Sequence, residues 1–269
     1  NKEAIICGWD LIQKKLNKFK TEFIPVDSEH FSIWYALKGV DKNLIDQIYL
    51  TASGGPFLNK SSKDLKKVNI KQATNHPNWK MGRKISIDSA TMINKVFEVI
   101  EAKKIFNLKN KDLSILIEPK SFVHAIVLLK GNLIKFLAHE TNMKIPISNA
   151  LNIKNKYKKN LSKHVIDFNK IRFEIPKINN FPVLSVLKLM PDNSSYFETI
   201  LITLNDLLVE MYLEGKINYV SIHKNLINLL KKQYFKKYYK LKPKNIYDIK
   251  NMIMITKNYI SNNLKYYEK

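Results

Sequence analysis

The sequence predicts a protein of the α/β class, with a β-sheet core in its first part and an all-helical C-terminal domain. In the first part, short apolar runs bounded by Gly, Pro and Ser alternate with one longer helical pattern. This alternation is typical of an α/β unit, here of about 150 residues. From residue 181 onward, apolar residues recur at helical spacing, with breaks at Pro191 and Gly215.

The strands are expected where short apolar runs lead into polar loops. They are residues 23–26, 48–51, 84–88 and 113–117, followed by a hairpin of residues 125–129 and 133–137. Lys130, Gly131 and Asn132 join the two hairpin strands, and Gly131 can adopt the positive φ that a three-residue turn needs.

One long helix is expected in the first part, over residues 90–106, with Asp88 or Ser89 as its N-cap. Residues 151–180 are rich in Lys and Asn, which suits a connecting segment. The expected helices of the C-terminal domain are residues 183–190, 196–213, 221–232 and 246–264.

The composition excludes several classes of protein. A chain of 269 residues with 45% hydrophobic and 26% charged residues is neither collagen-like nor wholly disordered. It has no uninterrupted apolar run of about 18 residues, so we expect no membrane span. The single cysteine, Cys7, allows no internal disulfide, which fits a reducing compartment. Because the sequence starts with Asn1 and shows no signal segment, we expect it to be an excerpt.

The formal net charge of +23 would ordinarily point to nucleic acid or an anionic membrane as a partner. Only Arg83 and Arg172 of the 46 basic residues are arginines, however, whereas nucleic-acid sites favour Arg for bidentate contacts. Lys and Asn, both abundant here, have A/T-rich codons. We therefore interpret the charge as mutational bias in an A/T-rich genome and expect neither nucleic acid nor membrane as a partner.

The first segment that suggests chemistry is residues 25–30, with the sequence PVDSEH. Asp27 and Glu29 are two residues apart, so at the end of a strand their carboxylates would point to the same side. Such a pair suits a hard cation such as Mg²⁺ or Mn²⁺. A solvated turn would show the same pattern.

The second segment places Ser53 beside Gly54 and Gly55, directly after an expected strand. Glycines allow the backbone to approach a ligand, and exposed N–H groups with a hydroxyl form a nest for an anion. An ordinary tight turn is the alternative.

The third segment runs from residue 76 to residue 98. Ser89 at an expected helix N-terminus, with Asn94 and Lys95 one turn later, would be well placed to bind a phosphate. Asn94, Glu98 and Glu101 form one polar stripe on an otherwise apolar helix.

Glu98 needs a partner, either as a third metal ligand or through an i, i+3 ion pair with Lys95. His76 could bind a ligand, cap a loop or lie in the core. Trp79 could be a packing residue.

Taken together, these segments resemble the 1-deoxy-D-xylulose 5-phosphate reductoisomerase family of the non-mevalonate isoprenoid pathway. The resemblance is dense over residues 1–106 and looser around His124 and Met143, and it fades to Asn205 and Asp206 in the helical tail. The motifs that carry it are residues 1–3, 25–30, 52–57, 76–82 and 87–98.

The resemblance implies a role for each matching residue. Asp27, Glu29 and Glu98 would bind Mg²⁺, Mn²⁺ or Co²⁺, and together with Lys2 they would be the catalytic residues. The implied substrate-binding residues are Ser28, Glu29, Ser53, His76, Ser89, Asn94, Lys95 and Glu98. Contacts to NADPH are implied for Lys2, Glu3, Gly82 and Met143, and Trp79 and Met81 would lie on a flexible flap over the substrate.

The implied reaction is the NADPH-dependent conversion of 1-deoxy-D-xylulose 5-phosphate to 2-C-methyl-D-erythritol 4-phosphate by a homodimer. No Gly-x-Gly-x-x-Gly motif occurs, so most of an N-terminal Rossmann-like NADPH domain is expected to be missing from this chain. The expected parts are the end of that domain (1–27), a catalytic domain (28–152), a connecting segment (153–180) and a helical domain (181–269).

The sequence departs from the family pattern at three places. Val96 stands where the family has Gly, Thr141 and Asn142 stand where Pro and Asp precede Met143, and Glu118 replaces a common His. The alternative function is therefore a decayed remnant, retained for metal binding or dimerisation. A nucleic-acid binder is a third hypothesis, motivated by the charge alone. The expected location is the cytoplasm of a bacterium with a reduced genome rather than a plastid.

Overall fold

The computed structural model describes residues 1–152 and 168–263, which form two compact units. The sheet unit combines residues 22–54 and 108–176, and the helical unit combines residues 1–21, 55–107 and 177–269. Each unit is therefore assembled from segments that are far apart in the sequence. The mixed α/β class predicted from the sequence is confirmed, and the division into four consecutive parts stays a prediction.

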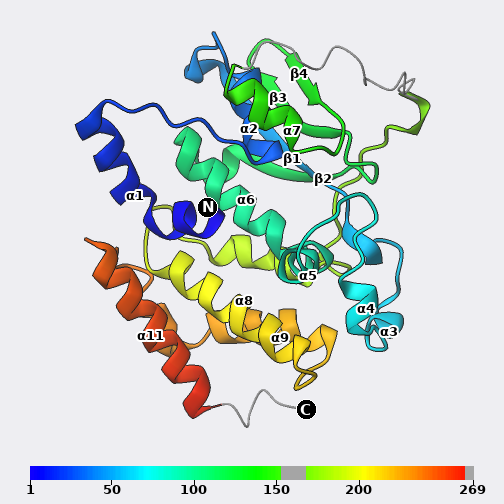
Figure 1. Ribbon diagram of the computed structural model, residues 1–269, viewed down its shortest axis with the longest axis vertical. Helices are drawn as coiled ribbons and strands as arrows, with labels where there is room; N and C mark the ends of the chain where they lie inside the picture. Colours follow the sequence, from blue (N-terminus) through cyan, green and yellow to red (C-terminus); the bar gives the residue numbers. More distant parts are fainter. Residues whose placement is uncertain (153–167, 264–269) are drawn as a thin grey trace. The chain divides into compact units, whose positions relative to one another are not determined.

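The sheet unit contains a four-stranded sheet in the order β2-β1-β3-β4 (Figure 1). β1 pairs in parallel with β2 and antiparallel with β3, and β3 pairs antiparallel with β4. Gly131 has positive φ at the β3–β4 turn, as predicted for this hairpin, and Asn132 has positive φ as well. The bounds are β1 Ile45–Ala52, β2 Leu113–Ile117, β3 Val123–Leu129 and β4 Leu133–Ala138, which confirms the strands expected in these regions.

Helix α2 (Ser28–Ala36) packs on β3 and β4 and so covers one part of this sheet. Another helix of the unit, α7 (Lys144–Ala150), contacts α2. Glu118, at the end of β2, is fully buried and accepts hydrogen bonds from the backbone N–H groups of Lys120 and Phe122, at 3.0 and 2.6 Å. A buried carboxylate needs such donors. Glu118 thus fixes the turn into β3, which explains how the chain accommodates this departure from the family pattern.

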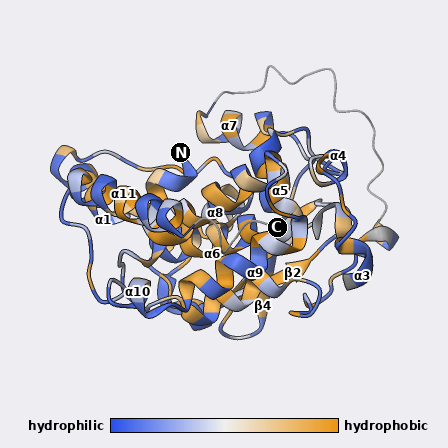
Figure 2. Ribbon diagram, turned by 90° about the horizontal axis from the view of Figure 1, so that it is seen from below, coloured by the Kyte–Doolittle hydropathy of each residue, from blue (hydrophilic) through white to orange (hydrophobic). Residues whose placement is uncertain are grey.

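The helical unit packs its longer helices against one another. α6 contacts α1, and α8 contacts both α9 and α11. Figure 2 shows long hydrophobic stretches on α6 and α8, which carry many fully buried side chains. The longer helices are α1 Lys2–Phe19, α5 Arg83–Thr91, α6 Ile93–Phe106, α8 Phe197–Leu213, α9 Tyr219–Leu230 and α11 Ile246–Asn262, and the shorter ones are α3 Ser62–Leu65, α4 Ile70–Ala73 and α10 Gln233–Lys236.

The helices predicted for the C-terminal domain are largely confirmed. α8, α9 and α11 lie where the apolar periodicity indicated them, with ends shifted by one or two residues, as is usual for helix ends. The segment predicted as a helix over residues 183–190 is instead a 3₁₀ helix, Pro182–Leu189. Most of the expected connecting segment, residues 153–167, lies outside the described residues.

The strand predicted over residues 23–26 is wrong, since these residues form neither helix nor strand. Pro25 has no N–H to donate to a sheet, and Val26 is exposed. The segment is a connection that leads to the N-cap of α2.

The strand predicted over residues 84–88 is also wrong, because these residues lie in α5. The alternation of Ile85 and Ile87 with polar residues suggested a strand. In α5, however, Ser86, Ile87 and Asp88 are buried in succession. This burial depends on tertiary contacts, so a five-residue apolar pattern cannot predict it.

The helix predicted over residues 90–106 is interrupted. α5 ends at Thr91, Met92 has a left-handed backbone with φ 67°, and α6 begins at Ile93. Asp88 and Ser89 are therefore not N-cap residues, and the N-cap of α5 is Gly82. Helices α1 and α2 were not predicted at all, although both carry candidate site residues.

Gly55 offers a test of this packing. Its φ is +66°, and a Cβ would lie 3.0 Å from both Ala90 Cα and Ser89 O. Gly55→Ala should lower the free energy of unfolding by about 2–4 kcal/mol, through backbone strain and overpacking together. Gly215→Ala is the matched control, since Gly215 has φ +75° but no heavy atom within 4 Å of a Cβ. Equal losses in urea unfolding of the two variants would contradict the close approach.

Candidate functional site

In the sheet unit, Asp27 and Glu29 lie at the start of α2, where Asp27 is the N-cap and Glu29 is in the first turn. The prediction that they follow a strand is wrong. A helix N-terminus nevertheless favours carboxylates, because its backbone N–H groups and dipole present positive partial charge. Ser28 Oγ donates a hydrogen bond of 2.6 Å to Glu29 Oε2, so the hydroxyl and the carboxylate are held together.

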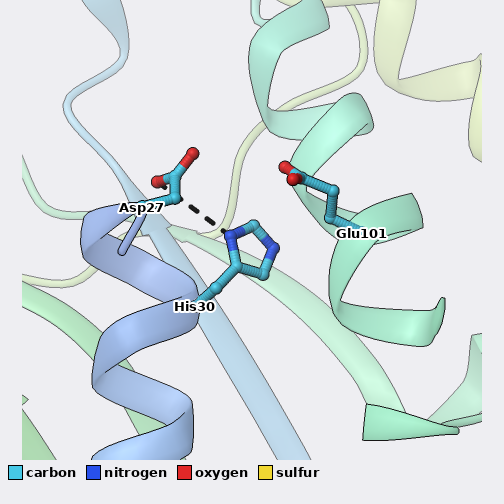
Figure 3. Close-up of side chains that lie close together, drawn as sticks. All are labelled: Asp27, His30 and Glu101. Atoms are coloured by element: carbon cyan, nitrogen blue, oxygen red, sulfur yellow. Dashed lines mark ion pairs between the residues drawn. The ribbon is translucent and has the colours of Figure 1, made fainter. Parts of the chain in front are cut away.

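His30 is a residue of this segment that was not singled out from the sequence. Its ring is fully buried, and its Nδ1 lies 4.0 Å from Asp27 Oδ1 (Figure 3). The i, i+3 spacing from Asp27 on a helix is the signal that could have found it, but the segment had been interpreted as the end of a strand. His30 restricts where the Asp27 carboxylate can point.

In the helical unit, four candidate residues form one cluster of contacts around Glu98. Lys2 Nζ donates to Asn94 Oδ1 at 2.8 Å and lies 3.5 Å from Glu98 Oε1. The Asn94 side-chain amide donates to Glu98 Oε1, and Lys95 pairs with Glu98 Oε2. The Glu98 side chain is only 2% exposed, so the two ammonium groups and the amide compensate a buried negative charge.

This Glu98 cluster comprises Lys2, Asn94, Lys95 and Glu98. It contains the i, i+3 ion pair between Lys95 and Glu98 that was the alternative to metal binding. This ion pair does not exclude metal binding, because a carboxylate has two oxygens and can accept several partners. Asn94 and Lys95 lie in the first turn of α6, where the helix end attracts anions. The cluster can therefore offer both a carboxylate oxygen and cationic groups to a ligand.

Ser89 and Ser53 occupy different positions from those expected. Ser89 is in the last turn of α5 rather than at a helix N-terminus. Ser53 directly follows β1 in the sheet unit and precedes Gly54 and Gly55, both with positive φ, which fits a turn of the nest type.

The segment between α4 and α5 contains His76 and the expected flap residues Trp79 and Met81. His76 Nδ1 accepts hydrogen bonds from the backbone N–H groups of Asn78, at 3.1 Å, and Trp79, at 3.0 Å. His76 therefore caps this loop, as one of its alternative interpretations proposed. Burial lowers the pKa of the His76 imidazole below its usual value, which favours this neutral, accepting form.

The residues expected to contact NADPH belong to both units. Lys2 belongs to the Glu98 cluster, Glu3 pairs with Lys84 at 3.5 Å, Gly82 is the exposed N-cap of α5, and Met143 is the exposed N-cap of α7 in the sheet unit. Their role toward a cofactor stays a prediction.

Two family models match this chain. One, the C-terminal domain of 1-deoxy-D-xylulose 5-phosphate reductoisomerase, matches residues 23–106. The other, the DXP reductoisomerase C-terminal domain, matches residues 139–258.

The relatives carry the same family name. A 1-deoxy-D-xylulose 5-phosphate reductoisomerase of Pelagibacter ubique is 51% identical over 254 residues, covering 94% of this chain and 65% of the relative. The protein of that name from a Wolbachia of Drosophila simulans is 40% identical over 225 residues, covering 82% of this chain and 58% of the relative. The chain thus spans less than two thirds of the length of these relatives.

Solved structures agree with the sequences. A crystal structure of DOX-P reductoisomerase in complex with NADPH, fosmidomycin and magnesium superposes with a TM-score of 0.88 at 30% identity, covering 98% of this chain and 69% of that one. The reductoisomerase of Zymomonas mobilis in complex with NADPH gives a TM-score of 0.81 at 28% identity, covering 95% and 65%.

The fold and the matched models thus correspond to the C-terminal domains of a reductoisomerase family. The chain belongs to the 1-deoxy-D-xylulose 5-phosphate reductoisomerase family. Within residues 1–152 and 168–263, no helix is both long and apolar enough to cross a bilayer.

The His76 cap predicts a pH-dependent loop. The folded pKa of His76 lies below the value of about 6.5 that the unfolded chain has. The contribution of His76 to stability is therefore complete above pH 6.5 and is lost as the pH falls through the folded pKa. In an NMR titration, the protection of the Asn78 and Trp79 amide protons, measured relative to the intrinsic exchange rate at each pH, should fall as the His76 ring protonates. A His76 pKa above 6.5, or unchanged protection, would contradict the cap.

Proposed function

We propose that this chain is the metal- and substrate-binding part of an enzyme that converts 1-deoxy-D-xylulose 5-phosphate to 2-C-methyl-D-erythritol 4-phosphate with NADPH. The observation that carries the proposal is the Glu98 cluster, in a chain of this family. The cluster assembles, from α1 and α6, the Lys, Asn, Lys and Glu that the family motifs contain. A decayed remnant would have no reason to keep a buried acid surrounded by these three partners.

The proposed metal ligands are Asp27, Glu29 and Glu98. Carboxylate oxygens are the donors that Mg²⁺ and Mn²⁺ prefer, and Co²⁺ also accepts them. Each of the three carboxylates offers two oxygen atoms as donors, so the donor set fits a divalent ion. When bound, the ion would act as a Lewis acid on two substrate oxygens.

Ser53, Ser89, Asn94 and Lys95 are proposed to bind the substrate phosphate, with His76 at the edge of that site. The first turn of α6 supports this assignment, because its backbone N–H groups and the Lys95 ammonium both favour an anion. Lys95 is buried, so its charge is poorly screened by water.

The remaining roles follow from the family. Ser28, held against Glu29, is proposed to hydrogen-bond the substrate hydroxyl groups. Lys2 is proposed to lie beside substrate and metal, and Trp79 and Met81 are proposed to exclude water as a flap. NADPH, which is bound in two related structures, would supply the hydride and contact Lys2, Glu3, Gly82 and Met143.

The departure at position 96 does not weaken the proposal. Val96 is fully buried in α6, so the side chain that replaces Gly adds to the core of the helical unit. Asn94, Lys95 and Glu98 keep their mutual contacts around it.

We also propose that the protein forms a homodimer. We propose the cytoplasm of a bacterium as its location, because the relatives are bacterial. The outer edge of the sheet supports self-association, because β4 exposes Leu133, Ile134 and Phe136. Contiguous exposed apolar side chains of this kind are typical of protein interfaces.

Glu98→Gln keeps the shape of the side chain but removes its charge. In the enzyme that contains this chain, we expect metal-dependent turnover to fall about 100-fold or more, since an acid among cationic partners is replaced by a weak ligand. Glu198→Gln is the matched control, because Glu198 is equally buried and pairs with Lys104 at 2.9 Å. Near-normal turnover of Glu98→Gln in an NADPH oxidation assay would contradict the assignment of Glu98 as a metal ligand.

Phe136→Asp tests the dimer. Phe136 is 57% exposed on β4, so a charge there should not disturb the sheet but should disrupt an apolar interface. Light scattering should show a dimer for the unaltered protein and a monomer for the variant. Met254→Asp, at an equally exposed position on α11, should leave the dimer intact. A variant that remains dimeric would place the interface elsewhere.

A further inference from the structure

A second group of charged residues in the helical unit lies outside the proposed site. Lys84 of α5 is surrounded by three carboxylates: Asp88 at 3.0 Å, Asp206 of α8 at 3.0 Å and Glu3 of α1 at 3.5 Å. Asn205 of α8 completes this Lys84 cluster by donating a 2.8 Å hydrogen bond to Asp88 Oδ1. The cluster thus joins three helices.

Lys84 is the residue that makes this arrangement stable. Asp88 is 2% exposed, and burial raises the pKa of its carboxyl group while Lys84 and Asn205 oppose that shift. Three carboxylates around one site repel one another unless a cation lies between them. Removing the single ammonium would leave a buried acid uncompensated, and the helices would have to move apart or let water in.

Two of the three carboxylates around Lys84 adjoin a proposed site residue in the sequence. Glu3 follows Lys2, and Asp88 precedes Ser89. The Lys84 ammonium also lies 5.6 Å from the centre of the Phe97 ring, and Phe97 precedes Glu98. Lys84 therefore contacts three residues, on α1, α5 and α6, that are each one peptide bond from a proposed site residue.

The end of α5 is held from other directions as well. Tyr219 Oη of α9 donates a 2.7 Å hydrogen bond to the carbonyl oxygen of Ala90, and Gly55 allows close approach to the same turn. With its N-terminal part fixed by Lys84, α5 has little freedom to shift relative to α6.

We propose that Lys84 is a positioning residue, which holds Lys2, Ser89 and Glu98 in the arrangement that binds the substrate phosphate and metal. Lys84 does not itself bind the anion. An ammonium group has three N–H donors, and three carboxylates of this chain already surround it. The inference rests on the proposed function, whose phosphate site it deepens, and it accounts for Asn205 and Asp206, the family residues in the tail that have no other role.

The test compares two buried lysines of the same unit. Lys84→Met removes the cation of the Lys84 cluster, and Lys104→Met removes the partner of Glu198, a buried ion pair outside the site. Inorganic phosphate is titrated into each protein, and binding is followed by NMR at the backbone amides of Asn94 and Lys95. We expect the dissociation constant to rise about tenfold or more for Lys84→Met, because the groups that bind phosphate would be displaced. For Lys104→Met, we expect it to rise by no more than about twofold.

Rescue separates positioning from general stability. Lys84→Arg keeps a cation among the carboxylates and should return the dissociation constant to within about threefold of the unaltered value. If Lys84→Met does not fold, Asn205→Ala replaces it, since loss of the hydrogen bond to Asp88 loosens the same cluster. We expect Asn205→Ala to weaken phosphate binding about threefold.

The outcomes distinguish the two hypotheses. If the unaltered protein binds no phosphate at Asn94 and Lys95, the proposed function fails, and this inference fails with it. If the unaltered protein binds phosphate and Lys84→Met or Asn205→Ala binds it equally well, only the positioning role is overturned. Equal weakening in Lys84→Met and Lys104→Met overturns that role too, because it shows a general effect of stability.

Discussion

The burial of one carboxylate constrains the arrangement of the helical unit. Glu98 is almost fully buried on a helix whose other buried residues are mostly apolar, so its charge must be compensated locally. Lys2, Asn94 and Lys95 provide that compensation, and they come from two helices. The start of α1 is therefore bound to the first turns of α6 by the same contacts that concentrate positive charge beside an acid.

A second set of charges extends this constraint. Lys84 joins α5 to α1 and α8, and two of the carboxylates that it contacts, Glu3 and Asp88, adjoin members of the proposed site in the sequence. Buried charges are costly unless every partner is in place, so such clusters favour one arrangement of helices over nearby alternatives. In this chain, Glu3, Asp88 and Phe97, which contact Lys84, directly adjoin Lys2, Ser89 and Glu98, which are proposed to bind ligand. The contacts of Lys84 therefore also fix the positions of the proposed site residues.

The sequence predicted the parts in which a local pattern determines the structure. The β3–β4 hairpin follows from Gly131 and the apolar runs beside it, and α8 and α11 follow from long apolar periodicity. It failed where tertiary contacts decide. Residues 84–88 alternate like a strand, but the Lys84 and Asp88 charges are satisfied only in a helix that faces α8.

Among the candidate site residues, composition and spacing alone could only indicate carboxylates and a helix N-terminus. The resemblance of whole motifs supplied the roles, whereas the helix that begins at Ser28 and the break at Met92 could not be predicted. A left-handed residue such as Met92 is stabilised by its surroundings, which a local pattern does not contain.

The account depends on Asp27, Glu29 and Glu98 sharing one divalent ion. Diffraction from crystals soaked in Mn²⁺, with anomalous scattering to locate the metal, tests this most directly. A single Mn²⁺ bonded to all three carboxylates at about 2 Å is the predicted result. Ordered Mn²⁺ elsewhere, with Glu98 still paired only to lysines and Asn94, would contradict it.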